Sequence, residues 1–408
     1  MIDQSRMRAG VVSLSRAGIN WLLLVVIAGA LIRALIATLL VHDSFDFETY
    51  RVLDQTLRTT PGAVFNSGIW PYPGLYFPVI VAAASLESLT SVDISVWVKI
   101  LPILADLGIA WLVQSYLGMR GASEGKRLAA AAAVLLGPSF FMISGYVGHI
   151  DSLAFLPVVF AMYAWRRWPE LRHREAMAAA LIGVGGALKT VPLLMVLAFL
   201  PEIPSWARRI RFGILSGVIP FLVLVPWLLV NPDSVKNLNY SGFPGAGGLS
   251  LALQPSLPRV FLAGEPGAYN TAIEKLNDYG TPILFVILGL LGLYLIFKRV
   301  PVERSTVLLW LAVFVFLPSF FFQYVIWGLP FFLMAGYVLH VVVAQGLLFA
   351  PQLMFEASRP LGAGQPVRPI SDSLVGPYVA IMLVVWAGTI AAFLAYLRQT
   401  LRLGQSTS

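Results

Sequence analysis

The sequence contains no cysteine, which excludes disulfide bonds, thiolate metal sites and a cysteine nucleophile. Charged residues are also scarce: 12% of the 408 residues are Asp, Glu, Lys or Arg, about half the share of a soluble domain. No Walker loop, HExxH pair, GxSxG turn or nucleotide-binding glycine fingerprint occurs, so ATP-driven transport and proteolysis lose support. An internal repeat is absent as well, which disfavours transporter folds built from inverted halves.

Apolar residues dominate the chain instead. They make up 58% of it, and the mean hydropathy is +0.80. We therefore expect an all-α, multi-pass protein of the cell membrane, with residues 1–408 forming a single integral membrane domain. The net charge of +8 belongs to cytoplasmic loops in such a chain, and we expect no nucleic-acid partner. The first apolar stretch is far longer than the core of a signal peptide, which indicates a retained span.

Clusters of Lys and Arg mark the cytoplasmic loops between apolar runs of about twenty residues. Six clusters occur: Arg6/Arg8/Arg16, Arg120/Lys126/Arg127, Arg166/Arg167/Arg172/Arg174, Arg208/Arg209/Arg211, Lys298/Arg299/Arg304 and Arg398/Arg402. Placing all six on one side of the membrane requires an even number of crossings between neighbouring clusters. We therefore expect a bundle of about eleven or twelve transmembrane helices.

Two long stretches lie on the outer side in this arrangement. Residues 42–94 form the first external loop, in which the proline-interrupted run from Tyr72 to Leu89 predicts a helix lying in the outer interface. Residues 231–280 form the second external loop, where Tyr240 is a candidate contact for the acceptor.

Several apolar runs are too short or too ambiguous to be simple spans. Ser152 to Trp165 has 14 residues, roughly 21 Å of helix, so the turn before it lies below the outer lipid surface. Ala176 to Ala207 predicts a shallow hairpin with its tip at GGALKTVP, and one full span is the alternative. Val325 to Phe355 is either one long helix or a tight pair, and the even number of crossings favours the pair.

Ionisable residues in membrane segments are costly and mark functional sites, and here most of them gather at the outer ends. The first external loop begins with Asp43, Asp46 and Glu48, which could bind substrate, accept a proton or hold a cation. Simple solvation is the alternative for any one of these loop acids. His149 and Asp151 follow at the sunken outer turn, where Asp151 could instead cap the next helix.

Basic residues supply the opposite charge. Lys189, at the hairpin tip, is placed to bind an anionic headgroup or phosphate, and snorkelling to lipid is the alternative. Arg33 in the first span is a second candidate for a donor phosphate. Lys99 and Asp106 lie seven residues apart on one helical face, and we expect them to form a structural pair outside the site.

Five short motifs occur in a fixed order along the chain. They are DFETY (Asp46 to Tyr50), YPGLYFP (Tyr72 to Pro78), GHIDSL (Gly148 to Leu153), GALKTVPLL (Gly186 to Leu194) and QYVIWGLP (Gln323 to Pro330). In the order and topology of these motifs, the chain resembles the polyprenyl-phosphate-sugar-dependent glycosyltransferases of the GT-C fold. The resemblance covers about residues 20–335 and is greatest to the prokaryotic mannosyltransferase branch of these enzymes. His149 stands where glutamine is frequent, and YPGL replaces the commoner YPPL.

The resemblance implies a GT-C-like bundle and an inverting transfer of one sugar, often mannose, from a polyprenyl phosphate to a lipid-linked or glycan acceptor at the outer face. It implies that Asp46 is the general base, that Asp151 is the second catalytic acid and that Lys189 lies near the donor phosphate. It also places Gln323 and Tyr324 at the substrate.

The residues themselves favour the same chemistry. Displacing a lipid phosphate from an anomeric carbon needs a base for the acceptor hydroxyl and a cation for the leaving phosphate, and Asp46 and Lys189 supply both. A divalent cation such as Mg²⁺ or Mn²⁺ could help hold the phosphate, although the residues require no cofactor. The alternatives are a secondary transporter or lipid flippase, which would recruit Arg33 and Lys99, and a lipid-binding scaffold that does not need Asp46.

Overall fold

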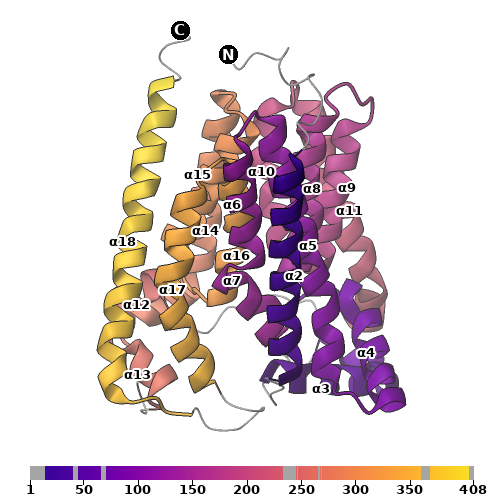
Figure 1. The fold of residues 1–408 in the computed structure, drawn as a ribbon, viewed down its shortest axis with the longest axis vertical. Coiled ribbons are helices and arrows are strands. Elements are labelled where there is room, and N and C mark those ends of the chain that lie inside the picture. The colour runs from indigo at the N-terminus through magenta and orange to yellow at the C-terminus, as the bar shows by residue number, and fades with distance from the viewer. Residues whose placement is uncertain are drawn as a thin grey trace.

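The computed structural model describes residues 14–39, 45–65, 70–232, 245, 247–264, 267, 269–359 and 368–403. This part of the chain is helical, and extended backbone pairs within it only as a single bridge between Gly247 and Phe320. An α-helix satisfies its own backbone N–H and C=O groups, as the interior of a bilayer requires. The expected all-α, multi-pass membrane fold is confirmed (Figure 1).

Seven segments of the described chain are long and apolar enough to cross a membrane. They are α2 (Arg16–Leu39), α5 (Ile94–Met119), the combined segment Glu124–Val147, α11 (Trp206–Val230), α14 (Thr271–Phe297), α17 (Val338–Ser358) and α18 (Asp372–Leu403). On α2 the side chains of Leu24, Ile27 and Leu31 are each more than half exposed. An apolar face of this kind is stable only against lipid chains.

Shorter helices complete the structure. Around the bundle these are α3 (Phe45–Thr59), η1 (Pro61–Ala63), η2 (Gly74–Tyr76), α4 (Phe77–Thr90), α12 (Gly248–Leu253) and α13 (Leu257–Leu262). Within it they are α6 (Glu124–Leu135), α7 (Pro138–Phe141), the π-helix η3 (Met142–Val147), α8 (Asp151–Arg167), α9 (Arg174–Leu188), η4 (Val191–Met195), α10 (Val196–Phe199), η5 (Leu200–Glu202), α15 (Val302–Phe316), η7 (Phe322–Tyr324) and α16 (Val325–Met334).

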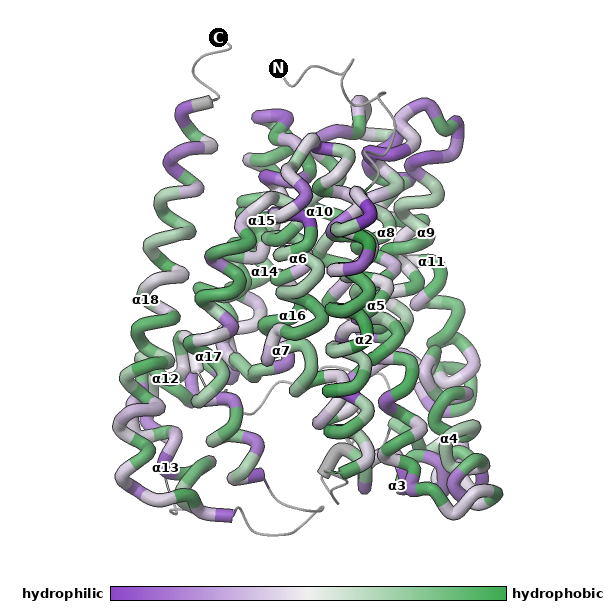
Figure 2. Tube along the Cα trace, viewed as in Figure 1, coloured by the Kyte–Doolittle hydropathy of each residue, from purple (hydrophilic) through white to green (hydrophobic). Residues whose placement is uncertain are grey.

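The clusters of Lys and Arg that lie in the described ranges gather at one end of the bundle, which we call the basic end. It holds the connections from α5 to α6, from α8 to α9, from η5 to α11 and from α14 to α15, together with the last turns of α18. In Figure 1 this end is at the top, and α3, α4 and α13 lie at the bottom. Figure 2 shows hydrophilic residues at both ends and a mainly hydrophobic band between them, as a membrane-embedded bundle requires.

Three helical hairpins have their turns close to one another inside the bundle. The segment α6–α7–η3 reverses into α8 at Gly148, α9 reverses into η4 and α10 at Lys189, and α15 reverses into α16 around η7. The hairpin predicted at GGALKTVP and the predicted pair between Val325 and Phe355 are confirmed, so the single-span alternatives are wrong. The segment Glu124–Val147 is already among the seven long segments, so the further expected crossings correspond to α8, α9, η4–α10, α15 and α16, which are short for a bilayer core.

The helices α3 and α4 cover the end of the bundle opposite the basic end. The interfacial helix predicted from Tyr72 to Leu89 is present as η2 and α4. Arg51 ties α3 to the start of α5, because its Nη2 lies 2.6 Å from Oδ2 of Asp93, the N-cap of α5. Partial burial raises the pKa of Asp93, but hydrogen bonds from Ser95 and the charge of Arg51 outweigh it and hold the pKa below its ordinary value.

The stretch predicted as a second external loop is more helical than expected. It contains α12 and α13, and α14 begins at Thr271, so the last ten residues of the 231–280 range belong to a helix. Its candidate Tyr240 lies outside the described residues.

Candidate active site

A buried ion pair lies where the turns of the three hairpins meet. Lys189, directly after α9, places its Nζ 2.6 Å from Oδ1 of Asp151, in the first turn of α8. Only 2% of the Lys189 side chain and 0% of the Asp151 side chain are exposed. Desolvating two charges is costly, so a buried pair in a membrane protein is first of all a functional candidate.

Close packing of α9 on α8 makes this pair geometrically feasible. A Cβ on Gly185 would lie 2.5 Å from the carbonyl oxygen of Ala154, so a larger residue would force the two helices apart. The helix α9 then ends at Leu188, Lys189 takes an extended backbone conformation, and Pro192 is the second residue of the 3₁₀ turn η4. The segment GGALKTVP thereby turns Lys189 towards Asp151.

The third hairpin contributes Trp327, from α16. Its Nε1–H donates a hydrogen bond to Oδ1 of Asp151, the oxygen that also faces Lys189. The other oxygen, Oδ2, is buried and accepts no hydrogen bond in the described part of the chain, and Nδ1 of His149 lies 3.7 Å from it. The N-cap of α8 is Ile150, with no side-chain capping bond, so the proposed capping role of Asp151 is wrong.

Aromatic rings surround the Lys189 ammonium. Its Nζ lies 4.8 Å from the ring centre of Tyr72, 5.2 Å from that of Trp327 and 5.9 Å from that of Tyr324. Tyr324 stacks on Trp327 with ring centres 4.0 Å apart. Such rings attract a cation and offer flat apolar surfaces to a ligand. Gln323 precedes Tyr324 in η7, so both residues expected at the substrate belong to this turn.

Tyr72 and Trp327 were not among the candidates derived from the sequence. Both lie inside motifs that the sequence analysis singled out, YPGLYFP and QYVIWGLP. An aromatic residue in an apolar run gives no chemical signal by itself, because most such residues pack in a core. Tyr72 and Trp327 are recognised as part of the candidate site only because the folded chain brings both rings next to the Lys189 ammonium.

Helix α3 lies against the turn that carries His149. The hydroxyl of Tyr50 donates a hydrogen bond of 3.2 Å to the carbonyl oxygen of Gly148, and a Cβ on Gly148 would lie 3.1 Å from the ring of Phe47. The φ of 74° at Gly148 also requires glycine. Asp46 precedes Phe47 in the first turn of α3, so the backbone brings it near the Asp151 turn; its side chain is outside the described part of the structure.

The other acids of the first loop are less informative. Oε2 of Glu48 lies 3.9 Å from Nη1 of Arg51 in an exposed ion pair one helical turn along α3. An exposed pair of this type contributes little energy and gives no sign of a site. Asp43 lies outside the described residues.

Arg33 belongs to a separate buried network. Its Nε and Nη2 donate to Oδ2 of Asp106 over 3.0 and 2.8 Å, and its remaining N–H groups donate to backbone carbonyl oxygens of α2 and α6. Asp106 also accepts hydrogen bonds from the hydroxyls of Ser144 and Ser152. All donors of Arg33 are thus used inside the protein, which does not fit the expected role at a donor phosphate. We correct that role to holding α2, α5 and the first hairpin together.

The predicted pair between Lys99 and Asp106 is also wrong. Asp106 pairs with Arg33, whereas Nζ of Lys99 is buried and donates no hydrogen bond within the described residues. It faces the ring of Phe47, 4.9 Å from its centre. Lys99 therefore fastens α3 to α5 through a cation–π contact.

No group of three or more His, Cys, Asp or Glu residues in the described ranges is arranged to hold a metal ion. Asp151 is engaged by Lys189 and Trp327 through one oxygen. The contribution of a divalent cation therefore stays a prediction.

Comparison with known families assigns a large part of this chain. The model of glycosyltransferase family 87 matches residues 70–322, more than half of the 408 residues. The matched range includes Tyr72, Asp151 and Lys189 and ends directly before Gln323. No individual curated protein matches the chain significantly.

Proposed function

The chain belongs to glycosyltransferase family 87, and from this premise we propose that it transfers a sugar from a polyprenyl-phosphate donor to a lipid-linked or glycan acceptor. Mannose is the first candidate for the sugar, and the transfer inverts the anomeric carbon. The observation that carries the proposal is the buried pair of Lys189 and Asp151 with its ring of aromatic side chains.

Lys189 binds the phosphate of the donor. An ammonium group has three N–H donors, and Asp151 takes one of them at 2.6 Å, which leaves donors for phosphate oxygens. As the bond to the sugar breaks, negative charge grows on the phosphate. A cation that is already held in place stabilises this charge without reorganisation. Asp151 positions the ammonium, and Trp327 fixes Asp151.

The aromatic residues hold the sugar. Tyr72, Tyr324 and Trp327 present rings within 6 Å of the Lys189 ammonium, so a sugar bonded to the phosphate there would lie against at least one of them. Ring faces pack against the apolar side of a sugar and exclude water from the reacting carbon.

Asp46 acts as the general base. An inverting reaction needs a carboxylate that takes the proton of the acceptor hydroxyl on the side opposite the leaving phosphate. The support for Asp46 is its place in the first turn of α3, which packs on the turn that carries His149 and leads to Asp151. The acceptor would then enter from the α3 side and the phosphate would leave towards Lys189.

The site faces the outside of the membrane in this proposal. Lys and Arg are enriched in cytoplasmic loops, and α3 and α4 cover the end opposite the basic end. The donor and acceptor would therefore meet at the outer face.

Sugar transfer in liposomes tests the proposal. Purified protein receives labelled polyprenyl-phosphate mannose and a panel of lipid acceptors, and Asp46→Asn is compared with Asp54→Asn. Asp54 is the matched control, because it lies on the same helix in a surface ion pair with Arg58. We expect wild type and Asp54→Asn to transfer mannose with inverted configuration, and Asp46→Asn to bind the donor but transfer nothing.

The same assay separates the alternatives. Normal transfer by Asp46→Asn would refute its role as base, and no transfer by wild type combined with movement of the labelled lipid between leaflets would favour a flippase. Repeating the wild-type reaction with EDTA and then with added Mg²⁺ or Mn²⁺ tests the divalent cation. A strict metal requirement would show loss of transfer with EDTA and recovery with the metal.

A further inference from the structure

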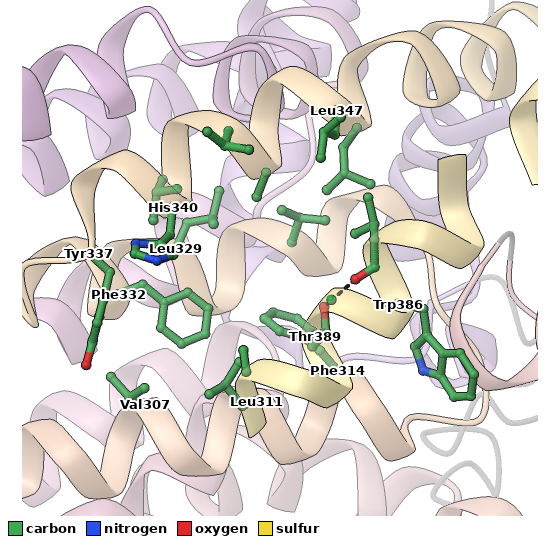
Figure 3. A pocket seen from close by; sticks show the side chains of 18 of the residues that line it. Val307, Leu311, Phe314, Leu329, Phe332, Tyr337, His340, Leu347, Trp386 and Thr389 are labelled. Carbon is green, nitrogen blue, oxygen red and sulfur yellow. Dashed lines mark hydrogen bonds between the residues drawn. The ribbon is translucent and has the colours of Figure 1, made fainter. Parts of the chain in front are cut away.

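A large apolar slot lies between α18 and the helices α15, α16 and α17. Its volume is about 750 Å³, within the range of about 300–1,000 Å³ that is typical of ligand sites. Figure 3 shows Leu311 and Phe314 on one side of the slot and Leu347 on another. The slot is distinct from the ion-pair site, because α16 contributes Leu329 and Phe332 to it rather than Trp327.

The polar side chains Thr389, in the middle of the slot, and Trp386, at one end of it, donate hydrogen bonds within the protein. The hydroxyl of Thr389 donates a hydrogen bond of 2.8 Å to the carbonyl oxygen of Val385, which is drawn as a dashed line in Figure 3. Nε1 of Trp386 donates to the carbonyl oxygen of Val315. This mainly apolar part of the slot therefore suits a hydrocarbon chain better than a polar ligand.

One end of the slot is polar. Tyr337 and His340 lie together at this end in Figure 3, far from Trp386. Tyr396 and Gln399, from the last turns of α18, also line the slot, and the ring centres of Tyr396 and Tyr337 lie 6.1 Å apart. Because α18 ends at the basic end of the bundle, the polar part of the slot lies at that end.

Cations surround this polar end. The ammonium of Lys126 lies 3.0 Å from the position of a Cβ on Gly336, the residue before Tyr337. Arg120, the C-cap of α5, and Arg304, in the first turn of α15, belong to the same end of the bundle. Glu303, the acid beside Arg304 on α15, forms its ion pair with Arg166, which also pairs with Glu202.

We propose that the slot binds one acyl chain of an anionic phospholipid, whose phosphate lies among the cations at the basic end. Charge complementarity selects this occupant, since a neutral lipid would leave the cations unused. The donor of the sugar is a poorer fit, because its phosphate belongs at Lys189 in the hairpin turns. The bound lipid would fasten α18, which contacts only α12, α13, α15 and α17 to any large extent in the described structure.

Two neighbouring alanines of α18 give a matched pair of variants. Ala392 and Ala391 are both exposed, but only Ala392 lines the slot. Ala392 lies seven residues before Gln399, about 10 Å along the helix. One leaflet of the hydrocarbon core is about 15 Å thick, so an acyl chain that enters at the polar end must pass Ala392. Ala392→Phe therefore places a ring in the slot and blocks it, whereas Ala391→Phe adds the same ring to α18 at a position that does not line the slot.

Native mass spectrometry of the full-length protein measures the occupancy with phosphatidylglycerol and phosphatidylcholine as probes. We expect wild type and Ala391→Phe to retain phosphatidylglycerol over phosphatidylcholine, and Ala392→Phe to retain at least about tenfold less of it. The double variant Lys126→Gln/Arg304→Gln removes two cations, each worth about a factor of five in affinity for an anionic lipid, and should lower retention by about 25-fold.

Three results would overturn the proposal. Equal retention by the two phenylalanine variants would place the lipid elsewhere, and equal retention of both phospholipids would remove the role of charge. Displacement of phosphatidylglycerol by a polyprenyl phosphate from wild type but not from Ala392→Phe would assign the slot to the donor. None of these readouts depends on sugar transfer.

Discussion

Replacing Lys189 by methionine removes the ammonium of the buried pair and keeps a flexible side chain of similar length. Asp151 is then left with the hydrogen bond from Trp327, at a position where 0% of its side chain is exposed and where Oδ2 accepts no hydrogen bond in the described structure. Removing one partner of a buried ion pair costs about 3–5 kcal/mol, because the other charge stays desolvated. We therefore expect Lys189→Met to be strongly destabilised.

A double-mutant cycle separates structure from chemistry. Asp151→Asn alone leaves the ammonium of Lys189 buried without its counter-ion and should destabilise the protein by a similar amount. Lys189→Met/Asp151→Asn removes both charges and should recover most of the lost stability. Thermal unfolding in detergent and in liposomes measures the four proteins. Against a total stability of about 5–15 kcal/mol for a folded domain, changes of this size are easily resolved.

Transfer activity completes the test. The double variant should stay inactive although it is stable, since no cation remains for the phosphate. A double variant that is both stable and active would show that the pair is only a structural brace. A Lys189→Met protein as stable as wild type would refute the reasoning from burial.

The remaining predictions concern the scaffold. Arg33→Met should lower the free energy of unfolding by about 3–5 kcal/mol, because it leaves Asp106 buried without its cation. A thermal unfolding midpoint equal to that of wild type would refute the stabilising role of the Arg33–Asp106 pair. Gly185→Leu should prevent α9 from packing on Ala154 of α8 and should abolish folding or sugar transfer. The control is Gly217→Leu on α11, which should be tolerated because no atom of another segment of the described structure lies within 4 Å of a Cβ there. The yield of folded protein in detergent and the transfer activity measure both variants. The pKa of Asp93 is lower in the folded protein than in the unfolded chain, so its carboxylate stabilises the fold above about pH 4 and loses this effect as the pH falls further. The difference in melting temperature between wild type and Asp93→Asn should therefore shrink on acidification.

Much of the fold follows from local features of the sequence. Hydropathy and scarce charge require membrane helices, because no other structure satisfies the backbone in lipid. The even number of crossings between basic clusters predicted the hairpin at Lys189 and the pair that begins at Val325, and both are present. These features are local in the chain, so a single sequence carries them.

The same local signals identified several residues of the candidate site. Asp151 and Lys189 stand out because an ionisable residue in an apolar run is rare and costly. The sequence also predicted that Gln323 and Tyr324 belong with them, and the third hairpin brings their turn to the ion pair.

Which side chains become partners was decided only by the tertiary structure. Periodicity placed Lys99 and Asp106 on one face of α5, but Asp106 bonds Arg33 from another helix, and Lys99 faces an aromatic ring. Trp327 reaches Asp151 across 176 positions of the chain. Helical spacing fixes which residues share a face, whereas the neighbour of that face depends on how all the helices pack, and no local pattern contains that information.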